Sequence, residues 1–420
     1  MSICDFMSIS RATAVSSRTR FFINAMVIIM SGISQSACSA SDTFEITREV
    51  LLREGREPSR IIRVDDGYII VGSGKRGGIA IKTDKLGNQK WSYFLPHESE
   101  LADSSEWPVF TGVVALQNGN TLLCGYKSKA GEGIRRGETL WGGAFVGLLV
   151  RLDRNGRLLD KREIFPHGDS GSRLNYIQNC VPLGDGAVVL GTATGFGDES
   201  KDGHWMIGLN EEGENQWEKV LPAEEAIAKS YAYGRPVPLL DGGVVISLQS
   251  LTSKKASTHI IKINKSGQIV AQRLYEQTLY SIFTLQPERT VQLLAVRDDK
   301  YPTTMMVTLD EKLQELPKAQ IKMDVASTIY RLADGSFVRF GMHLKFGGEL
   351  VPAIQRVGSD LMEFRESLLK PESVVSGIRD AVPTGTPGEF ATVRKIFHGF
   401  DGKASLEEGA GIGLTMVKIK

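Results

Sequence analysis

The residue types that could do chemistry are present in the sequence, but they stand apart from one another. The six histidines are single, without a second histidine or a cysteine at the short spacings of metal sites; they are His97, His167, His204, His259, His343 and His398. No G-x-S-x-G motif precedes a predicted helix. The glycine-rich segments 72–78 and 195–203 lie between predicted strands, where no helix N-terminus could hold a phosphate. The sequence therefore predicts no catalytic residue, no metal site and no enzymatic activity.

Composition limits the kinds of partner. The chain has 420 residues, of which 41% are hydrophobic, and 50 Lys+Arg balance 49 Asp+Glu for a formal net charge of +1. A chain so near neutrality has no bulk field that would attract nucleic acid or an anionic membrane. We expect a globular protein with enough apolar residues for its own core and with no nucleic-acid partner.

The first forty residues differ from the rest and resemble an export signal. Arg11, Arg18 and Arg20 precede the apolar run 21–30, and small and polar residues follow it. This order is typical of a secretory signal peptide, because the apolar run is short for a membrane span. We expect residues 1–40 to be a signal peptide, with an uncleaved N-terminal anchor as the alternative. The protein is then exported, either periplasmic or anchored in the cell envelope.

Two details of this segment stay open. Cys38 follows Ser36 and Ala37, as in a bacterial lipobox, so it is a candidate lipidation site, although Gln35 stands where that motif has an aliphatic residue. Met7 could be the first residue of the translated chain. We expect contact with a membrane only through this lipid or through the anchor.

Cys124 and Cys180 are the cysteines of the predicted folded part. Both lie in apolar, strand-like runs, TLLCGY and YIQNCVPL. Two buried thiols that act as small hydrophobic residues are the simpler interpretation. A disulfide requires Cα atoms within about 7 Å of each other and an oxidising compartment. Two cysteines alone cannot form a zinc site.

A repeat with a period of about forty to fifty residues organises the chain. In each unit an apolar strand ends in a D-G or N-G turn and a second strand follows at once, which is the strongest short hairpin signal. These turns are Asp66-Gly67, Asn118-Gly119, Asp185-Gly186 and Asp241-Gly242. A third strand then ends in Asp or Asn, followed by x-x-G and a fourth strand; the residues are Asp84 and Gly87, Asp153 and Gly156, Asn210 and Gly213, and Asn264 and Gly267. Four antiparallel strands per unit predict a propeller blade.

The predicted fold is an all-β, roughly seven-bladed β-propeller of four-stranded antiparallel blades that forms a single domain over residues 41–420. The expected blades are 59–96, 110–166, 176–222, 233–277, 281–323, 325–370 and 375–420. Segment 42–52 alternates like a strand but has no unit of its own, and the last unit lacks a fourth strand. We expect segment 42–52 to complete the last blade and close the ring, with an exposed lead-in strand as the alternative.

One short motif resembles a known family. The pattern D-x-x-G-x-x-x-W runs from Asp84 to Trp91 and, with Asn for Asp, from Asn210 to Trp217. It resembles the quinoprotein-like (PQQ-type) repeats of bacterial β-propellers, a group that includes an outer-membrane assembly lipoprotein. Quinone-dependent dehydrogenases of that group use two adjacent cysteines, which this sequence lacks, so the resemblance implies a member without a cofactor. Trp91 and Trp217 are interpreted as outer-strand residues that pack between blades.

The connections divide the predicted ring into two faces. The short D-G and x-x-G turns lie on one face, and the long connections lie on the other, where binding residues concentrate. The long connections are 96–109, 129–143, 166–175, 195–203 and 398–412. We predict a protein-binding surface on this long-loop face, formed by the aromatic and basic residues Trp107, Arg135, Arg136, Trp141, His204, Trp205 and Tyr301. For Trp107 and Trp141, a small satellite core under the loops is the alternative.

The inner ends of the units favour binding over catalysis. The positions near the starts of the first strands are mostly hydroxyl residues and not acids or histidines; they are Ser59, Thr111, Tyr176, Tyr233, Ser281, Ser327 and Ser376. We therefore expect a monomeric, non-catalytic protein-binding scaffold of the bacterial cell envelope whose partner is another envelope protein. One alternative is an immunity-type protein that neutralises a periplasmic toxin or effector. Another is an enzyme or carbohydrate-binding propeller with its site at the central channel.

Overall fold

The structure is a computed structural model. It describes residues 44–74, 77–96, 108–128, 145–166, 174–194, 203–222, 231–233, 236–251, 256–275, 278–285, 290–297, 303–310, 312–314, 319–320, 326–344, 350–358, 364–368, 374–397 and 410–419. In these ranges the chain forms 29 β-strands. None of the described segments is a helix long and apolar enough to cross a membrane.

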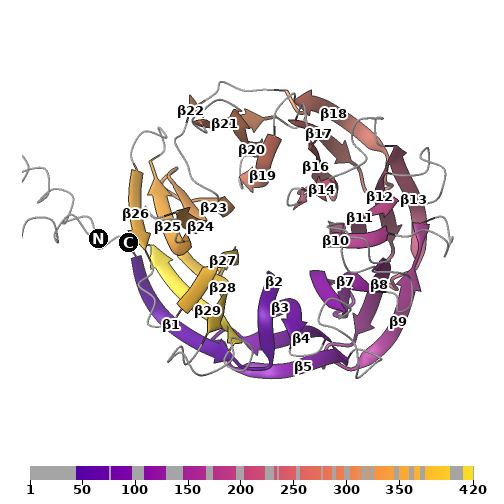
Figure 1. Ribbon diagram of the computed structural model, residues 1–420, viewed down its shortest axis with the longest axis horizontal. Coiled ribbons are helices and arrows are strands. Elements are labelled where there is room, and N and C mark those ends of the chain that lie inside the picture. Colours follow the sequence, from indigo (N-terminus) through magenta and orange to yellow (C-terminus); the bar gives the residue numbers. More distant parts are fainter. Residues whose placement is uncertain are drawn as a thin grey trace, which may run out of the picture.

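The strands lie in a ring of antiparallel meanders, each of which runs from the centre outward (Figure 1). The first sheet has β2 (Gly55–Val64), β3 (Gly67–Gly74), β4 (Gly77–Asp84) and β5 (Gln89–Pro96). The second has β6 (Val109–Ala115), β7 (Thr121–Ser128), β8 (Phe145–Leu152), β9 (Leu158–Ile164), β10 (Leu174–Leu183), β11 (Gly186–Thr194), β12 (Gly203–Leu209) and β13 (Asn215–Pro222).

The remaining strands complete the ring. The third sheet has β14 (Tyr231–Tyr233), β15 (Val237–Pro238), β16 (Val244–Leu251), β17 (Ala256–Ile263) and β18 (Ile269–Tyr275). The fourth has β19 (Thr278–Leu285), β20 (Thr290–Arg297), β21 (Thr303–Leu309) and β22 (Ala319–Gln320). The fifth has β23 (Ala326–Arg331), β24 (Phe337–Leu344), β25 (Leu350–Val357) and β26 (Phe364–Leu368). The last has β27 (Val374–Pro383), β28 (Glu389–Phe397), β29 (Ala410–Ile419) and, outermost, β1 (Phe44–Leu52).

The number of sheets differs from the sequence prediction. The described strands form six sheets, so the expectation of about seven separate four-stranded blades is wrong. The expected blades 110–166 and 176–222 belong to one eight-stranded sheet, because Leu174 at the start of β10 pairs in parallel with Phe145 at the start of β8. A parallel pair between two meanders leaves no mark in the turn pattern on which the prediction rests. The architecture is an all-β propeller of six sheets.

The N-terminal strand closes the ring, and this part of the prediction is confirmed. β1 pairs antiparallel with β29, from Phe44 opposite Ile419 to Leu52 opposite Ile412. In Figure 1, β1 lies on the circumference outside β29 and reaches toward β5. Leu52 and Ile412 are buried in one cluster with Ile61 of the neighbouring sheet. The strand also covers backbone groups at the edge of β29 that would otherwise be unpaired.

Alternating side chains explain how the sheets pack. In β3, Ile70 joins a cluster with the ring-closing sheet, whereas Ile69 and Val71 join a cluster with the next sheet. Because both faces of the sheet are covered, β3 carries a continuous apolar run and not an apolar-polar alternation. The core of this propeller therefore lies between sheets, in a series of separate clusters.

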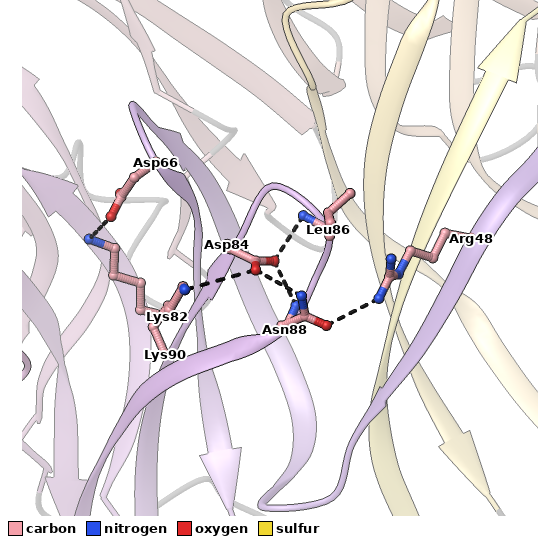
Figure 2. A network of polar contacts seen from close by, with 7 residues as sticks. All are labelled: Arg48, Asp66, Lys82, Asp84, Leu86, Asn88 and Lys90. Carbon is pink, nitrogen blue, oxygen red and sulfur yellow. Dashed lines mark hydrogen bonds and ion pairs between the residues drawn. The ribbon is translucent and has the colours of Figure 1, made fainter.

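The Asp or Asn that ends the third strand of a unit shapes the following turn. Figure 2 shows the turn after β4, where Asp84 Oδ1 accepts hydrogen bonds from Leu86 N at 2.9 Å and Asn88 N at 2.8 Å. Asp153 binds the turn after β8 in the same way. Gly87 takes a φ of 82°, a conformation that favours glycine. The D-x-x-G pattern is thus a self-contained Asx-type turn.

Leu313 shows that this turn survives the loss of its glycine. The turn after β21 keeps Asp310, whose Oδ1 accepts from Lys312 N and Gln314 N at 2.8 Å each, but Leu313 holds the glycine position at a φ of 60°. That conformation costs a non-glycine residue about 1–2 kcal/mol. The Leu313 side chain is buried with Val245 and Ile260 of the third sheet, and burial of a leucine contributes about 1.5–3 kcal/mol. Burial therefore offsets the strain.

Outer strands are joined to the next turn around the ring, and we call these links the side-to-side contacts. In each, a donor on the outermost strand of one meander reaches a polar atom in the third-to-fourth-strand turn of the next. The contacts are Arg48 to Asn88 (3.1 Å), Trp91 to Arg154 O (3.2 Å), Arg162 to Gly213 O, Lys219 to Gly267 O (2.6 Å) and Arg273 to Leu313 O (3.2 Å). Figure 2 shows the first of them.

The two repeat tryptophans reinforce the same junctions. A Cβ at Gly156 would lie 2.6 Å from the Trp91 ring, and one at Gly267 would lie 2.3 Å from the Trp217 ring. Each glycine therefore lets a tryptophan of the preceding unit lie flat on its turn. The interpretation of Trp91 and Trp217 as packing residues between units is confirmed.

Cys124 and Cys180 form a disulfide, which decides between the two sequence interpretations. Their Cα atoms are 6.1 Å apart, on β7 and β10. Gly112 on β6 makes room for the bridge, because a Cβ there would lie 2.7 Å from Cys124 Sγ and 2.5 Å from Cys180 N. Thr111 donates to Ile177 O at 3.0 Å beside it. The two halves of the eight-stranded sheet are thus joined covalently as well as by hydrogen bonds.

We predict that the disulfide is a main contributor to stability. The bridge closes a segment with a sequence separation of 56 residues, for which the loop-entropy relation gives about 4 kcal/mol. The variant Cys124→Ala with Cys180→Ala should lose up to that amount in urea unfolding. A reductant should destabilise the natural protein but not this variant. An unfolding midpoint that does not change with reductant would contradict the prediction.

We also predict that Trp91 holds two sheets together through its ring. Trp91→Ala should lower the free energy of unfolding by about 2–3 kcal/mol, because both the ring and its hydrogen bond to Arg154 O are lost. Trp91→Phe keeps most of the packing and should cost about 1 kcal/mol. Urea unfolding of both variants measures the difference. Equal losses would mean that the indole N–H, and not the ring, carries the contact.

Candidate binding site

A bulge recurs in the strands that line the centre of the ring. In six of these strands the register shifts past a single unpaired residue, and an extra residue of this kind bends a strand and re-aims a side chain. The extra residues are Ser59 in β2, Thr111 in β6, Gln178 in β10, Tyr280 in β19, Ser327 in β23 and Arg379 in β27. Arg379 is the charged member of this set. Three of the hydroxyl positions predicted at the inner ends, Ser59, Thr111 and Ser327, are bulge residues.

The seam between β27 and β2 is the most irregular part of this inner layer. β2 has a second register shift between Gly55 and Glu57, and β27 has a second one between Val375 and Ile378. Arg379 Nη2 lies 2.8 Å from Glu57 Oε1, and Lys395 Nζ on β28 lies 3.8 Å from Glu57 Oε2. Two positive charges therefore share one carboxylate across the junction of two sheets.

A buried carboxylate lies directly behind this seam. Asp380 is 1% exposed and accepts hydrogen bonds from Ile61 N of β2 at 3.1 Å and from Thr328 Oγ1 of β23 at 3.3 Å. Arg60 Nη1 lies 3.9 Å from the same carboxylate. Asp380 thus connects three neighbouring sheets, and its charge is compensated inside the protein. It is a structural residue, in contrast to Arg379 beside it.

Aromatic side chains continue the seam toward the eight-stranded sheet. Tyr126 on β7 and Tyr176 on β10 have ring centroids 4.2 Å apart, and the Phe145 ring lies 5.3 Å from Tyr126 and 5.9 Å from Tyr176. Burial raises the pKa of the Tyr126 hydroxyl, and Tyr176 and the Glu57 carboxylate raise it further. Tyr126 therefore stays protonated at neutral pH and can donate a hydrogen bond.

These groups form one candidate site, which we call the rim site: Glu57, Tyr126, Tyr176, Arg379 and Lys395. Tyr126 lies just before the long connection 129–144, Tyr176 just after 167–173, and Lys395 just before 398–409. The rim site therefore lies where the inner strands meet the long-loop face. A polar and aromatic surface of this kind can bind a partner. Among the described residues, no group of three or more His, Cys, Asp or Glu side chains could hold a metal ion.

The structure places two of the residues predicted from sequence. His204 and Trp205 lie on β12 and are buried, 6% and 1% exposed, in contrast to the exposed side chains expected at a loop exit. Trp205 packs in a core cluster, and its Nε1 donates a hydrogen bond to Glu218 Oε1 at 2.8 Å. Its role is therefore structural. The other predicted positions lie outside the described residues; they are Trp107, Arg135, Arg136, Trp141, Tyr301 and Cys38.

Sequence reasoning missed most of the rim site. Tyr176 is named among the inner-end positions, but Glu57, Tyr126, Arg379 and Lys395 are not. The available signal was charge inside strands that should be apolar, as at Glu57-Pro58 and Arg379-Asp380. The register shifts that make such charges tolerable cannot be read from the spacing of turns.

The comparisons with known proteins show a fold and no family. A scan against protein-family models found no matching model, and a search of curated proteins found no match. Among solved structures, the polysaccharide lyase Uly1 matches with a TM-score of 0.54 and 8% identity over 90% of this chain and 100% of that chain. A protein of unknown function from Dyadobacter fermentans DSM 18053 matches with a TM-score of 0.50 and 10% identity over 90% and 100%.

A third structure, YCF48 bound to D1 peptide, matches with a TM-score of 0.48 and 10% identity over 90% of this chain and 97% of that chain. At identities of 8% and 10%, the likeness to the first two structures shows the fold alone. Function must therefore be argued from the residues of this chain.

Buried His204 predicts a pH dependence of stability. Burial and the neighbouring His259 lower the pKa of His204 from 6.5 to about 4. As the pH falls below 6.5 the unfolded chain takes up a proton that the native state accepts only near pH 4, so stability is lost across that window. Between pH 7 and pH 5 the loss should be about 2 kcal/mol. Urea unfolding of His204→Gln should show a smaller loss, and an equal loss would contradict this assignment.

Proposed function

We propose that the protein is a non-catalytic, protein-binding β-propeller that acts in the cell envelope through its long-loop face, with the rim site at the centre of the contact. The observation that carries the proposal is the rim site itself, which combines Arg379 with a tyrosine pair. Arg379 is 44% exposed, and arginine and tyrosine are the residue types that supply most of the energy of protein interfaces.

The opposite face supports this assignment because its polar groups serve the fold. In its turns, Asp or Asn side chains accept hydrogen bonds from the backbone of the same turn. The side-to-side contacts donate hydrogen bonds to further carbonyl groups of these turns. Inner turns are also joined to each other, as Gly184 N donates to Gly242 O at 3.1 Å and Gln117 to Asp185 at 3.1 Å. A face built from such contacts offers little for recognition, so the long-loop face is the one for a partner.

The compartment is part of the proposal. The Cys124–Cys180 disulfide supports export, because structural disulfides persist in oxidising compartments such as the periplasm. The basic and apolar N-terminal segment with Cys38 supports a signal peptide or an envelope anchor. We further propose a monomer without a cofactor, related to the PQQ-type repeat propellers through the D-x-x-G-x-x-x-W units. The partner class is an envelope protein, and a toxin or effector is one member of that class.

A pull-down with matched variants tests the function. The tagged protein is incubated with envelope extract and compared with Tyr126→Ala plus Arg379→Ala, and with Trp141→Ala plus Arg135→Ala in a long loop. Each pair should lower recovery of a specific partner about tenfold or more, because central aromatic and arginine anchors dominate binding energy.

The control is Lys85→Ala plus Leu86→Ala, two exposed residues in the turn after β4. This variant should recover the partner as the natural protein does. Urea unfolding of all variants separates loss of binding from loss of fold. Recovery that both binding-face variants leave unchanged, or that the control abolishes, would overturn the proposal.

A further inference from the structure

The described bulge positions around the centre of the ring differ in charge. Ser59, Thr111 and Gln178 are neutral and half-buried, whereas Arg379 is charged and exposed. Because the inner strands are flanked by sheets on both sides, an exposed side chain at such a bulge points away from the core. The bulge in β27 therefore presents a guanidinium, whereas the side chains of Ser59, Thr111 and Gln178 are half-buried hydroxyl and amide groups.

We propose that Arg379 binds a carboxylate of the partner, so that the segment held at the rim site is acidic. This inference rests on the proposed function and specifies the chemistry of the bound segment. Arg379 is 44% exposed and donates through Nη2 to Glu57 Oε1 at 2.8 Å. A guanidinium has five donors in a rigid fork that matches a carboxylate with two parallel hydrogen bonds. Its contact with Glu57 uses one nitrogen, so a second carboxylate can bind at the other edge.

The other charged groups nearby already have partners, so this guanidinium is the group at which an anion can bind. Asp380 is buried and already pairs with Arg60 and accepts hydrogen bonds from Ile61 N, Thr328 Oγ1 and Ala381 N. Arg394 is paired with Glu49. Glu57 is half-exposed and is approached by both Arg379 and Lys395. An anion at this guanidinium is attracted by the positive charge of Arg379 and, at longer range, by that of Lys395, and the attraction is strongest at low ionic strength.

Removal of the Glu57 charge distinguishes a binding site from a purely structural ion pair. If the Arg379–Glu57 pair serves only to hold β27 against β2, removal of either charge weakens the seam. If Arg379 binds an incoming carboxylate at its other edge, the negative charge of Glu57 repels that carboxylate. Removal of the Glu57 charge then strengthens binding, whereas removal of the Arg379 charge weakens it. The two roles predict opposite signs for Glu57→Gln.

The test is fluorescence anisotropy with a labelled peptide of six glutamates, and the six-glutamine peptide as its control, at low and at moderate salt. Arg379→Gln should raise the dissociation constant of the glutamate peptide about fivefold, and Lys395→Gln should raise it by a smaller factor. Glu57→Gln should lower it about threefold. Lys85→Gln removes one exposed positive charge in the turn after β4 and should leave it unchanged. Urea unfolding shows that each variant is folded.

Three results would overturn the inference: no preference for the glutamate peptide, equal effects of Arg379→Gln and Lys85→Gln, or weaker binding by Glu57→Gln. If Arg379→Gln fails to fold, the inference is decided by whether Glu57→Gln lowers and Lys395→Gln raises the dissociation constant of the glutamate peptide. Recovery of a specific envelope partner without any binding of the glutamate peptide removes this inference and keeps the proposed function. In the opposite case, the variants bind the glutamate peptide with the predicted order of dissociation constants, but Tyr126→Ala plus Arg379→Ala recovers the same envelope partners as the natural protein. That result removes the proposed function and keeps the anion site.

Discussion

A donor on the outer strand of one meander reaches the third-to-fourth-strand turn of the next, and the ring depends on this contact. Each sheet alone buries only part of its apolar surface, so neighbouring sheets must meet at a defined angle for their side chains to interdigitate. Trp91 on Gly156 and Trp217 on Gly267 pack at two junctions, the second of which also has Lys219. Arg48, Arg162 and Arg273 act at other junctions. The Asx-type turns provide carbonyl groups at fixed positions for these donors.

This constraint separates the two faces of the molecule. One face consists of tight turns, whose polar groups form hydrogen bonds within the turn and with the neighbouring meander. The opposite ends of the strands lead into connections that vary in length along the sequence. The rim site lies at those ends. Behind it, buried Asp380 links β27 to β2 and β23, and the exposed Arg379–Glu57 ion pair also joins β27 to β2.

Two junctions have more than the repeating contact. β1 pairs with β29 inside the last sheet and continues directly into β2 of the first sheet, so the chain itself joins the last and first sheets. The junction within the eight-stranded sheet gains the Cys124–Cys180 bridge, which also fixes β7 against β10 and so positions Tyr126 against Tyr176. The charged part of the rim site therefore lies beside the junction that β1 closes, and the aromatic part lies beside the disulfide.

The sequence by itself determined the local chemistry. Asp and Asn at the ends of third strands, the glycines that follow and the apolar runs of the second strands predicted turns, meanders and a propeller, because these features depend on residues close in sequence. The closing strand was predicted by matching segment 42–52, which has no unit of its own, to the last unit, which lacks a fourth strand. The tertiary structure alone decided the six sheets, the disulfide and the rim site. Leu174 meets Phe145 only across a long connection, and Arg379 and Glu57 are 322 residues apart. Such contacts depend on how the ring closes and where its inner strands bulge, which no spacing along the chain records.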